Sequence, residues 1–246
     1  MDRRDVLALL LGAAAGEASS ATAPALAPLH IVTTHLPPLV LEPGEQRAGA
    51  LRELVEALCR RLGLAANLDF MPWRRALYLT GATPRTAIFP LTRLAEREAA
   101  FRWLAPLYEE NYVFMARLDS GFDVQRSQDM RGKRVALLRG AAQSAMLAEL
   151  GFHQLVEGSS LDEIHRFLLA GMADAVFGER AIIHSSLRMR GAQKQFRVGP
   201  PVRSTTAWLA GSPDVGEAEA GRYRAAMAAL VRDGTQARIF RKYGLA

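Results

Sequence analysis

The chain has 246 residues, of which 50% are hydrophobic and 23% are charged, a composition typical of folded globular proteins rather than disordered ones. Its formal net charge is +6, but Lys and Arg are scattered, so the pattern excludes a nucleic-acid-binding arm. The single cysteine, Cys59, excludes a disulfide framework and a cysteine-based zinc site. This length allows one large domain or two of ordinary size.

Residues 1–27 are predicted to be a signal peptide. Arg3 and Arg4 precede a short apolar run, which is followed by small residues through Ala27. The run is too short for a helix that stops in a membrane, and the arginine pair loosely resembles a twin-arginine export signal. The sequence therefore predicts a periplasmic protein.

Short apolar runs and apolar residues spaced three or four apart predict alternating strands and helices. Strands are expected over 30–34, 66–70, 87–91, 111–117, 135–138, 173–180 and 205–210. Helices are expected over 49–62 and 159–169, after Pro72, after Gly140, and on both sides of a turn at Asp233 and Gly234. Cys59 lies on the apolar stripe of the first helix, which favours a buried hydrophobe over a reactive thiol.

The segment 87–108 is the most informative part of the chain. It begins as a buried strand, meets Pro90 and Thr92, and then becomes a charged segment that is predicted to open a helix. In open α/β sheets the carboxyl ends of strands face a crevice, and helix N-termini favour anions. A hydroxyl group and an arginine at this place therefore predict a site for a small anion.

The same segment resembles a known family. Thr92-Arg-Leu-Ala-Glu-Arg97, with Phe101 and Pro106-Leu-Tyr108, is similar to the signature of family 3 extracellular solute-binding proteins, the polar amino-acid receptors of ABC importers. The resemblance implies that Arg97 grips the α-carboxylate of a ligand. It also implies that Thr92 contacts the carboxylate or the ammonium. The alternative is that Arg97 is a solvated helix arginine.

Two further segments carry the resemblance. Asp129–Gln143 is similar to the segment that opens the second lobe in this family, where the backbone N–H at the position of Ala142 binds the ligand carboxylate. Ala173–Arg180 is similar to a motif whose last acid, Glu179 here, pairs with the ligand α-ammonium. The alternative for Glu179 is an exposed acid paired with Arg180. Residues 233–244 resemble the closing structural signature of the family.

The residues around the rest of the expected pocket leave its specificity open. Trp73 is either an aromatic cover for the ligand or a core residue. Pro90 is included in the expected site, although members of the family usually have a small hydroxyl residue at this position. Leu36 stands where members of the family usually have an aromatic residue. Thr34 stands where receptors for basic amino acids have an acid, which disfavours lysine or arginine as the ligand.

The resemblance implies an α/β, two-lobed, periplasmic-binding-protein-like (type II) fold with the ligand cleft between the lobes. Lobe 1 is expected to comprise residues 28–114 and 205–246, and lobe 2 the inserted residues 115–204. The implied function is capture of a zwitterionic α-amino acid by hinge closure and its delivery to an inner-membrane ABC permease. The protein is expected to act as a monomer without a cofactor, a metal or nucleic acid.

Two alternatives come from other functional classes. Periplasmic cyclohexadienyl (prephenate/arogenate) dehydratases share the implied fold and a glutamate in the second lobe, so Glu179 could act as a general acid if burial raises its pKa. A stand-alone binding or sensing module is the other alternative. The five histidines lack metal-ligand spacing and Cys59 lacks an evident catalytic partner, so nothing indicates hydrolysis or metal chemistry.

Overall fold

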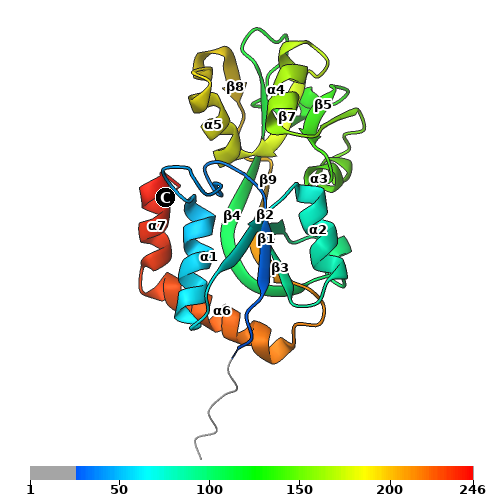
Figure 1. Cartoon of the computed structure of the whole chain (residues 1–246). Helices are drawn as coiled ribbons and strands as arrows, with labels where there is room; N and C mark the ends of the chain where they lie inside the picture. Colours follow the sequence, from blue (N-terminus) through cyan, green and yellow to red (C-terminus); the bar gives the residue numbers. More distant parts are fainter. Residues whose placement is uncertain (1–25, 246) are drawn as a thin grey trace, which may run out of the picture.

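Two lobes joined by two long strands make up the computed structural model, which describes residues 26–245 (Figure 1). The predicted signal peptide, except for its last two residues, lies outside the described residues. One sheet runs through both lobes in the strand order β2-β1-β3-β9-β4-β7-β5-β6, with β8 paired to β4. No helix in the described range is long and apolar enough to cross a membrane.

Lobe 1 is built from both ends of the chain. Its central strand β1 pairs in parallel with β2 and β3, and helices cover both faces of this sheet (Figure 1). Its strands are β1 His30–Thr33, β2 Asn67–Phe70 and β3 Thr86–Thr92, and its helices are α1 Ala50–Arg61, α2 Trp73–Ala82, α6 Glu217–Arg232 and α7 Thr235–Tyr243. The core between the sheet and α1, α6 and α7 includes Cys59, which is buried as expected.

Lobe 2 has the same kind of layered packing on a smaller scale. Its strand β5 pairs in parallel with β6 and β7, and separate apolar clusters fill the two faces. Its strands are β5 Val135–Leu138, β6 Leu155–Gly158, β7 Ala175–Glu179 and β8 Phe196–Val198, and its helices are α3 Gln143–Glu149, α4 Leu161–Leu169 and α5 Arg180–Met189. Two 3₁₀ turns, η2 Ser127–Met130 and η3 Gln193–Gln195, complete it.

The strands β4 Arg102–Arg117 and β9 Arg203–Gly211 connect the lobes. They pair antiparallel from Arg102 opposite Gly211 to Tyr112 opposite Arg203, and β4 then continues along β7 in lobe 2. The expected lobe boundaries, at 114/115 and 204/205, fall within these strands. Because the strands are continuous, the boundaries stay a prediction.

The helix predicted to begin after Thr92 is wrong in extent. The charged segment forms only the 3₁₀ helix η1 Ala95–Arg97, and the chain enters β4 five residues later. The residues after Phe101 pair with β9 as part of the sheet, so the helical segment before them stays short. Pro90 lies inside β3, where the pairing with β9 is irregular between Ile88 and Leu91.

Candidate functional site

The carboxyl ends of two pairs of parallel strands, β1 and β3 in lobe 1 and β5 and β7 in lobe 2, meet at a cavity between the lobes. Thr34 directly follows β1, Thr92 ends β3, Leu138 ends β5 and Glu179 ends β7, and all four line this cavity. Within each lobe the parallel strands end at one edge, which is where open α/β folds bind ligands. The two edges face each other because the antiparallel pairings of β3 with β9, β9 with β4 and β4 with β7 make the two strand pairs run in opposite directions. The topology thus brings together residues that lie far apart in the sequence.

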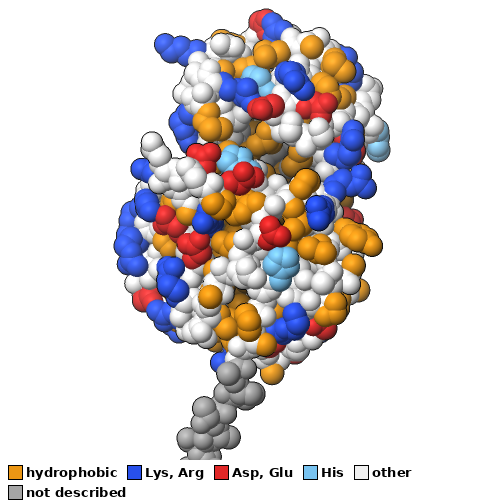
Figure 2. All heavy atoms as spheres, viewed as in Figure 1, with side chains coloured by type: hydrophobic (Ala, Val, Ile, Leu, Met, Phe, Trp, Pro, Cys, Tyr) orange, Lys and Arg blue, Asp and Glu red, His pale blue; other side chains and the backbone are white. Residues whose placement is uncertain are grey.

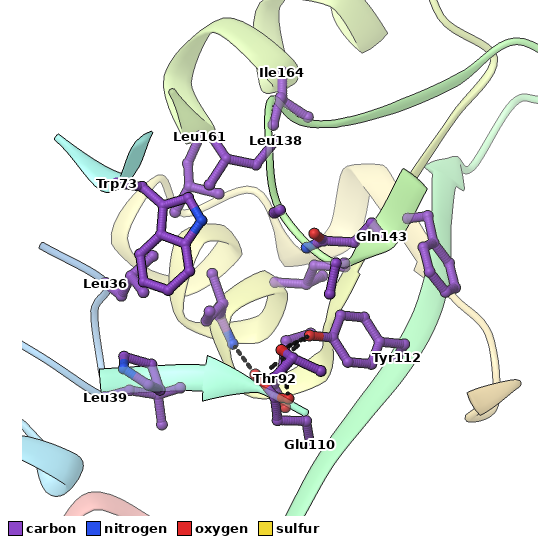
Figure 3. Close-up of a pocket in the computed structure, with 18 of the residues that line it drawn as sticks. Leu36, Leu39, Trp73, Thr92, Glu110, Tyr112, Leu138, Gln143, Leu161 and Ile164 are labelled. Carbon is purple, nitrogen blue, oxygen red and sulfur yellow. Dashed lines mark hydrogen bonds between the residues drawn. The ribbon is translucent and has the colours of Figure 1, made fainter. Parts of the chain in front are cut away.

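The cavity has an inner and an outer part. The inner part has a volume of about 90 Å³, and it is lined by all six residues predicted for the site: Trp73, Pro90, Thr92, Arg97, Ala142 and Glu179. Apolar side chains supply most of the remaining wall, including Leu36, Leu39, Leu138, Leu161 and Ile164 (Figure 3). The outer part, of about 580 Å³, shares Thr34, Leu36, Trp73, Leu138 and Leu161 with the inner part.

Arg97 is a buried cation at the cavity wall. The residue is only 8% exposed, and its Nη1 donates a hydrogen bond to the carbonyl oxygen of Thr92 at 3.2 Å. Within residues 26–245, no carboxylate oxygen lies within 4.0 Å of its nitrogens. Burial lowers the pKa of Arg97 from its ordinary value, because a charged group is poorly solvated there. A guanidinium group so placed is suited to bind an anion.

Thr92 is joined to two residues of β4. Its Oγ1 donates to Oε2 of Glu110 at 2.9 Å and lies 3.3 Å from the hydroxyl group of Tyr112, which itself donates to Oε1 of Glu110 at 3.2 Å (Figure 3). The only proton of the Thr92 hydroxyl is therefore committed to Glu110. In this arrangement Thr92 can accept a hydrogen bond from a ligand ammonium, but it cannot donate one to a carboxylate.

Glu110 is a buried acid that the sequence analysis missed. Burial raises its pKa from 4.5 to about 7; the negative charge of Glu179 adds to the rise, while the hydrogen bond from Thr92 opposes it. The signal was available in the alternation of β4, where Tyr108, Glu110, Tyr112 and Phe114 share one face and only Glu110 is charged. Tyr112 and Gln143 are further lining residues that were not predicted.

Glu179 ends β7 and caps the next helix. It is 3% exposed, and its Oε2 accepts a hydrogen bond from the backbone N–H of Ile182 at 2.9 Å, which satisfies one of the free donors of α5. Its Oε1 accepts from the hydroxyl group of Tyr108 at 3.1 Å. Burial raises the pKa of Glu179. Over the described range it forms no ion pair with Arg180, so the alternative reading as an exposed paired acid does not describe it.

The remaining predicted residues come from both lobes. Trp73 begins α2 in lobe 1, and Pro90 lies in β3 next to the site. Ala142 is the residue before α3 in lobe 2, and it follows Gly140, whose φ of 74° gives the tight turn that the sequence predicted. The structure therefore gathers every predicted site residue around one cavity.

Charged side chains of both signs are mixed on the visible face of the molecule (Figure 2). On the face seen in Figure 2, Lys and Arg side chains are spread over both lobes, and apolar side chains lie in the waist between them. In the part of the chain that the structure describes, no group of three or more His, Cys, Asp or Glu residues is arranged to hold a metal ion.

No protein-family profile matches the sequence, and a search of curated proteins finds no sequence match. Solved structures are similar to it. The ligand-binding core of GluR0 from Nostoc punctiforme, in complex with L-glutamate, is 18% identical, with a TM-score of 0.75 over 89% of this chain and all of that one. An ABC uptake transporter substrate-binding protein from Streptococcus pneumoniae with bound histidine is 17% identical, with a TM-score of 0.75 over 87% and 91% of the two chains.

A third similar structure is a sensory one. A histidine kinase sensor domain with similarity to periplasmic binding proteins is 20% identical, with a TM-score of 0.77 over 87% of this chain and 95% of that one. A ligand-binding core, a substrate-binding protein of a transporter and a sensor domain thus share the architecture. The chain has the two-lobed α/β fold of the periplasmic binding proteins, and the resemblance seen in the sequence is confirmed at the level of structure.

Proposed function

We propose that this protein is an extracytoplasmic binding protein for a small zwitterionic α-amino acid. The observation that carries the proposal is Arg97, a buried guanidinium group at the cavity wall with no carboxylate partner among residues 26–245. Leaving a charge buried without an opposite charge is costly, and a ligand carboxylate removes that cost. The predicted N-terminal signal and the similar structures with amino-acid ligands support the same conclusion.

The ligand ammonium group is proposed to lie near Glu179 and the Thr92 hydroxyl. Glu179 is a buried carboxylate that lines the cavity, so it offers the ammonium group a charge-assisted contact. Thr92 belongs to lobe 1 and Glu179 to lobe 2. A ligand that contacts both binds the closed form better than an open one, so binding favours hinge closure.

Isothermal titration calorimetry with a panel of L-amino acids tests this proposal. We expect at least one of them to bind the wild-type protein, and Arg97→Ala to weaken that binding roughly 30-fold or more, the usual effect of removing one partner of a buried charge pair. Arg75→Ala is the matched control, since Arg75 is exposed on α2 and does not line the cavity. Binding that survives Arg97→Ala unchanged would overturn the carboxylate role.

Delivery to an inner-membrane ABC permease, by a monomeric protein, is the finer part of the proposal. It rests on the expected export and on the similarity to substrate-binding proteins of ABC transporters. Uptake of the radiolabelled ligand by cells that lack this chain tests it, with the wild-type protein and Arg97→Ala restored separately. Unchanged uptake in the deletion strain would instead favour the sensing alternative.

A dehydratase is the second candidate, favoured by one specific observation. Glu179 is buried at the cavity and its pKa is raised, which is the property required of a general acid. Incubating the purified protein with prephenate and following the absorbance of phenylpyruvate tests this reaction. Product formation by the wild type that is lost in Glu179→Gln would establish the enzyme, and no product would remove this candidate.

A further inference from the structure

Two polar atoms at the cavity are buried and have no hydrogen-bond partner. They are Nε1 of Trp73, which comes from lobe 1, and Oε1 of Gln143, which comes from lobe 2. Both residues line the inner cavity, and Figure 3 shows the indole nitrogen of Trp73 and the amide group of Gln143 facing the space between them. The third unpaired atom among the described residues, Nε1 of Trp103, belongs to a residue that does not line this cavity.

Unpaired polar atoms of this kind are unusual. The large majority of buried side-chain polar atoms have a partner, because burying a donor or acceptor without one costs the solvation it had in water. Two such atoms on facing sides of one ligand cavity, one a donor and one an acceptor, call for a partner that is not part of the chain. A bound ligand group would provide it.

We infer that the ligand carries, besides its charged head group, a neutral group that both accepts and donates hydrogen bonds. A hydroxyl group or a carboxamide fits this description. The indole N–H of Trp73 can only donate, so the ligand group must accept; Oε1 of Gln143 can only accept, so it must also donate. This inference rests on the proposed function, because it concerns the side chain of the amino acid held at Arg97.

The leucines next to the two atoms disfavour a charged side chain in the inner part of the cavity, because charged residues of the outer part, such as Arg74 and Asp162, do not line the inner part. The neighbouring wall of the cavity is formed by Leu36, Leu138 and Leu161. An ammonium or carboxylate group at this place would lose its hydration and gain no opposite charge from these residues. A purely apolar side chain would fit the leucines but would leave both polar atoms unpaired.

The two atoms also link recognition to closure. Neither is accessible to water in this arrangement, and they belong to different lobes. Opening the lobes would expose both atoms to water, and closing them without a ligand would strip that water away. The closed form is therefore penalised until a ligand group replaces the water, so the side-chain group favours closure along with the α-amino and α-carboxylate groups.

Calorimetry with two pairs of amino acids tests the inference. L-threonine and L-valine have nearly the same shape but differ by a hydroxyl group, and L-glutamine and L-methionine differ by a carboxamide at similar length. We expect the polar member of at least one pair to bind about tenfold more tightly. Trp73→Phe and Gln143→Met, which keep the shape of each side chain, should each reduce that preference several-fold. Trp103→Phe, which removes an unpaired indole N–H outside the cavity, should leave it intact.

The outcomes separate this inference from the proposed function. If neither pair shows a preference for its polar member, or if both Trp73→Phe and Gln143→Met keep that preference, the inference is wrong while binding at Arg97 stands. If no amino acid binds the wild-type protein, or if Arg97→Ala has no effect, the proposed function fails, and the inference fails with it. Each variant removes one of the two contacts, so a folding defect in one leaves the other as the test.

Discussion

Burial of the Glu110 carboxyl group makes the stability of the protein depend on pH. This residue is 6% exposed, and burial raises its pKa from 4.5 to about 7 in the folded protein. The folded state therefore holds the proton more strongly than the unfolded chain does. The resulting stabilisation is fully present below about pH 4.5 and is lost as the pH rises through about 7.

Replacing Glu110 with Gln should remove this dependence. Thr92 and Tyr112 donate to different oxygens of Glu110, so the glutamine keeps an acceptor for one of them, and it does not titrate. Between pH 4.5 and pH 8 we expect the wild-type protein to lose up to about 3 kcal/mol in its free energy of unfolding relative to Glu110→Gln. Urea unfolding across this pH range measures the difference. Glu109→Gln, at an exposed neighbouring position, is the control, and parallel curves for Glu110→Gln and the wild type would contradict the prediction.

The position of several predicted site residues at the ends of strands could be predicted from the sequence. Thr92, Ala142 and Glu179 follow or end predicted strands, and parallel pairing brings such ends to one edge within each lobe. That the two edges face each other depends on the long antiparallel strands β4 and β9. The hydrogen bonds of these residues were not predictable. That Glu179 accepts from Tyr108, 71 residues earlier in the chain, depends on how β4 passes β7, and no local pattern contains that register.

At the scale of secondary-structure elements, the start of α1 depends on a glycine. Gly49 precedes the helix with φ 91° and ψ 148°, a backbone conformation that is almost exclusive to glycine. A Cβ atom there would lie 2.6 Å from the backbone oxygen of Leu39, which is too close for any side chain. Leu39 lines the cavity, so this close approach of two backbone segments also shapes the site.

Gly49→Ala should destabilise the protein by about 3 kcal/mol or more, because backbone strain and a clash with backbone atoms act together. Gly44→Ala is a matched control: Gly44 has a φ of 101°, but nothing lies within 4 Å of its Cβ position. That variant should lose only about 1–2 kcal/mol, from backbone strain alone. Chemical denaturation of both variants measures the difference, and equal losses would show that the clash is relieved by movement of the loop before α1.

Helix ends were predictable from the sequence, in contrast to the extent of β4. Ser160 caps α4 by accepting from the backbone N–H of Glu163, and the Glu163 carboxylate accepts in return from the backbone N–H of Ser159. This exchange needs only residues within one turn, so the local sequence contains it. The strand β4 extends from Arg102 because β9, about 100 residues later, pairs with it, and the charged residues before it gave a misleading helical signal.

At the scale of the whole molecule, the arrangement of cores and connections favours hinge motion. Each lobe has its own buried apolar clusters, and β4 and β9 are the strands that pass between the lobes. Two well-packed bodies joined by a pair of strands can rotate about those strands while their cores stay intact. The cavity residues divide between the bodies, with Trp73, Thr92 and Arg97 on one side and Ala142 and Glu179 on the other.

Binding of an amino acid identified by calorimetry should therefore make the protein more compact. A ligand that contacts Arg97 and Glu179 at once stabilises the closed form, so its saturating addition should lower the radius of gyration measured by small-angle X-ray scattering. The emission of Trp73, at the cavity, should change with the same ligand concentration dependence, whereas Trp73→Phe should remove that change and leave the compaction. Arg97→Ala should need a correspondingly higher ligand concentration for both effects. A ligand that binds tightly to the wild type without compaction would mean that binding occurs within one lobe, because a site shared between two lobes cannot be filled on both sides while they remain apart.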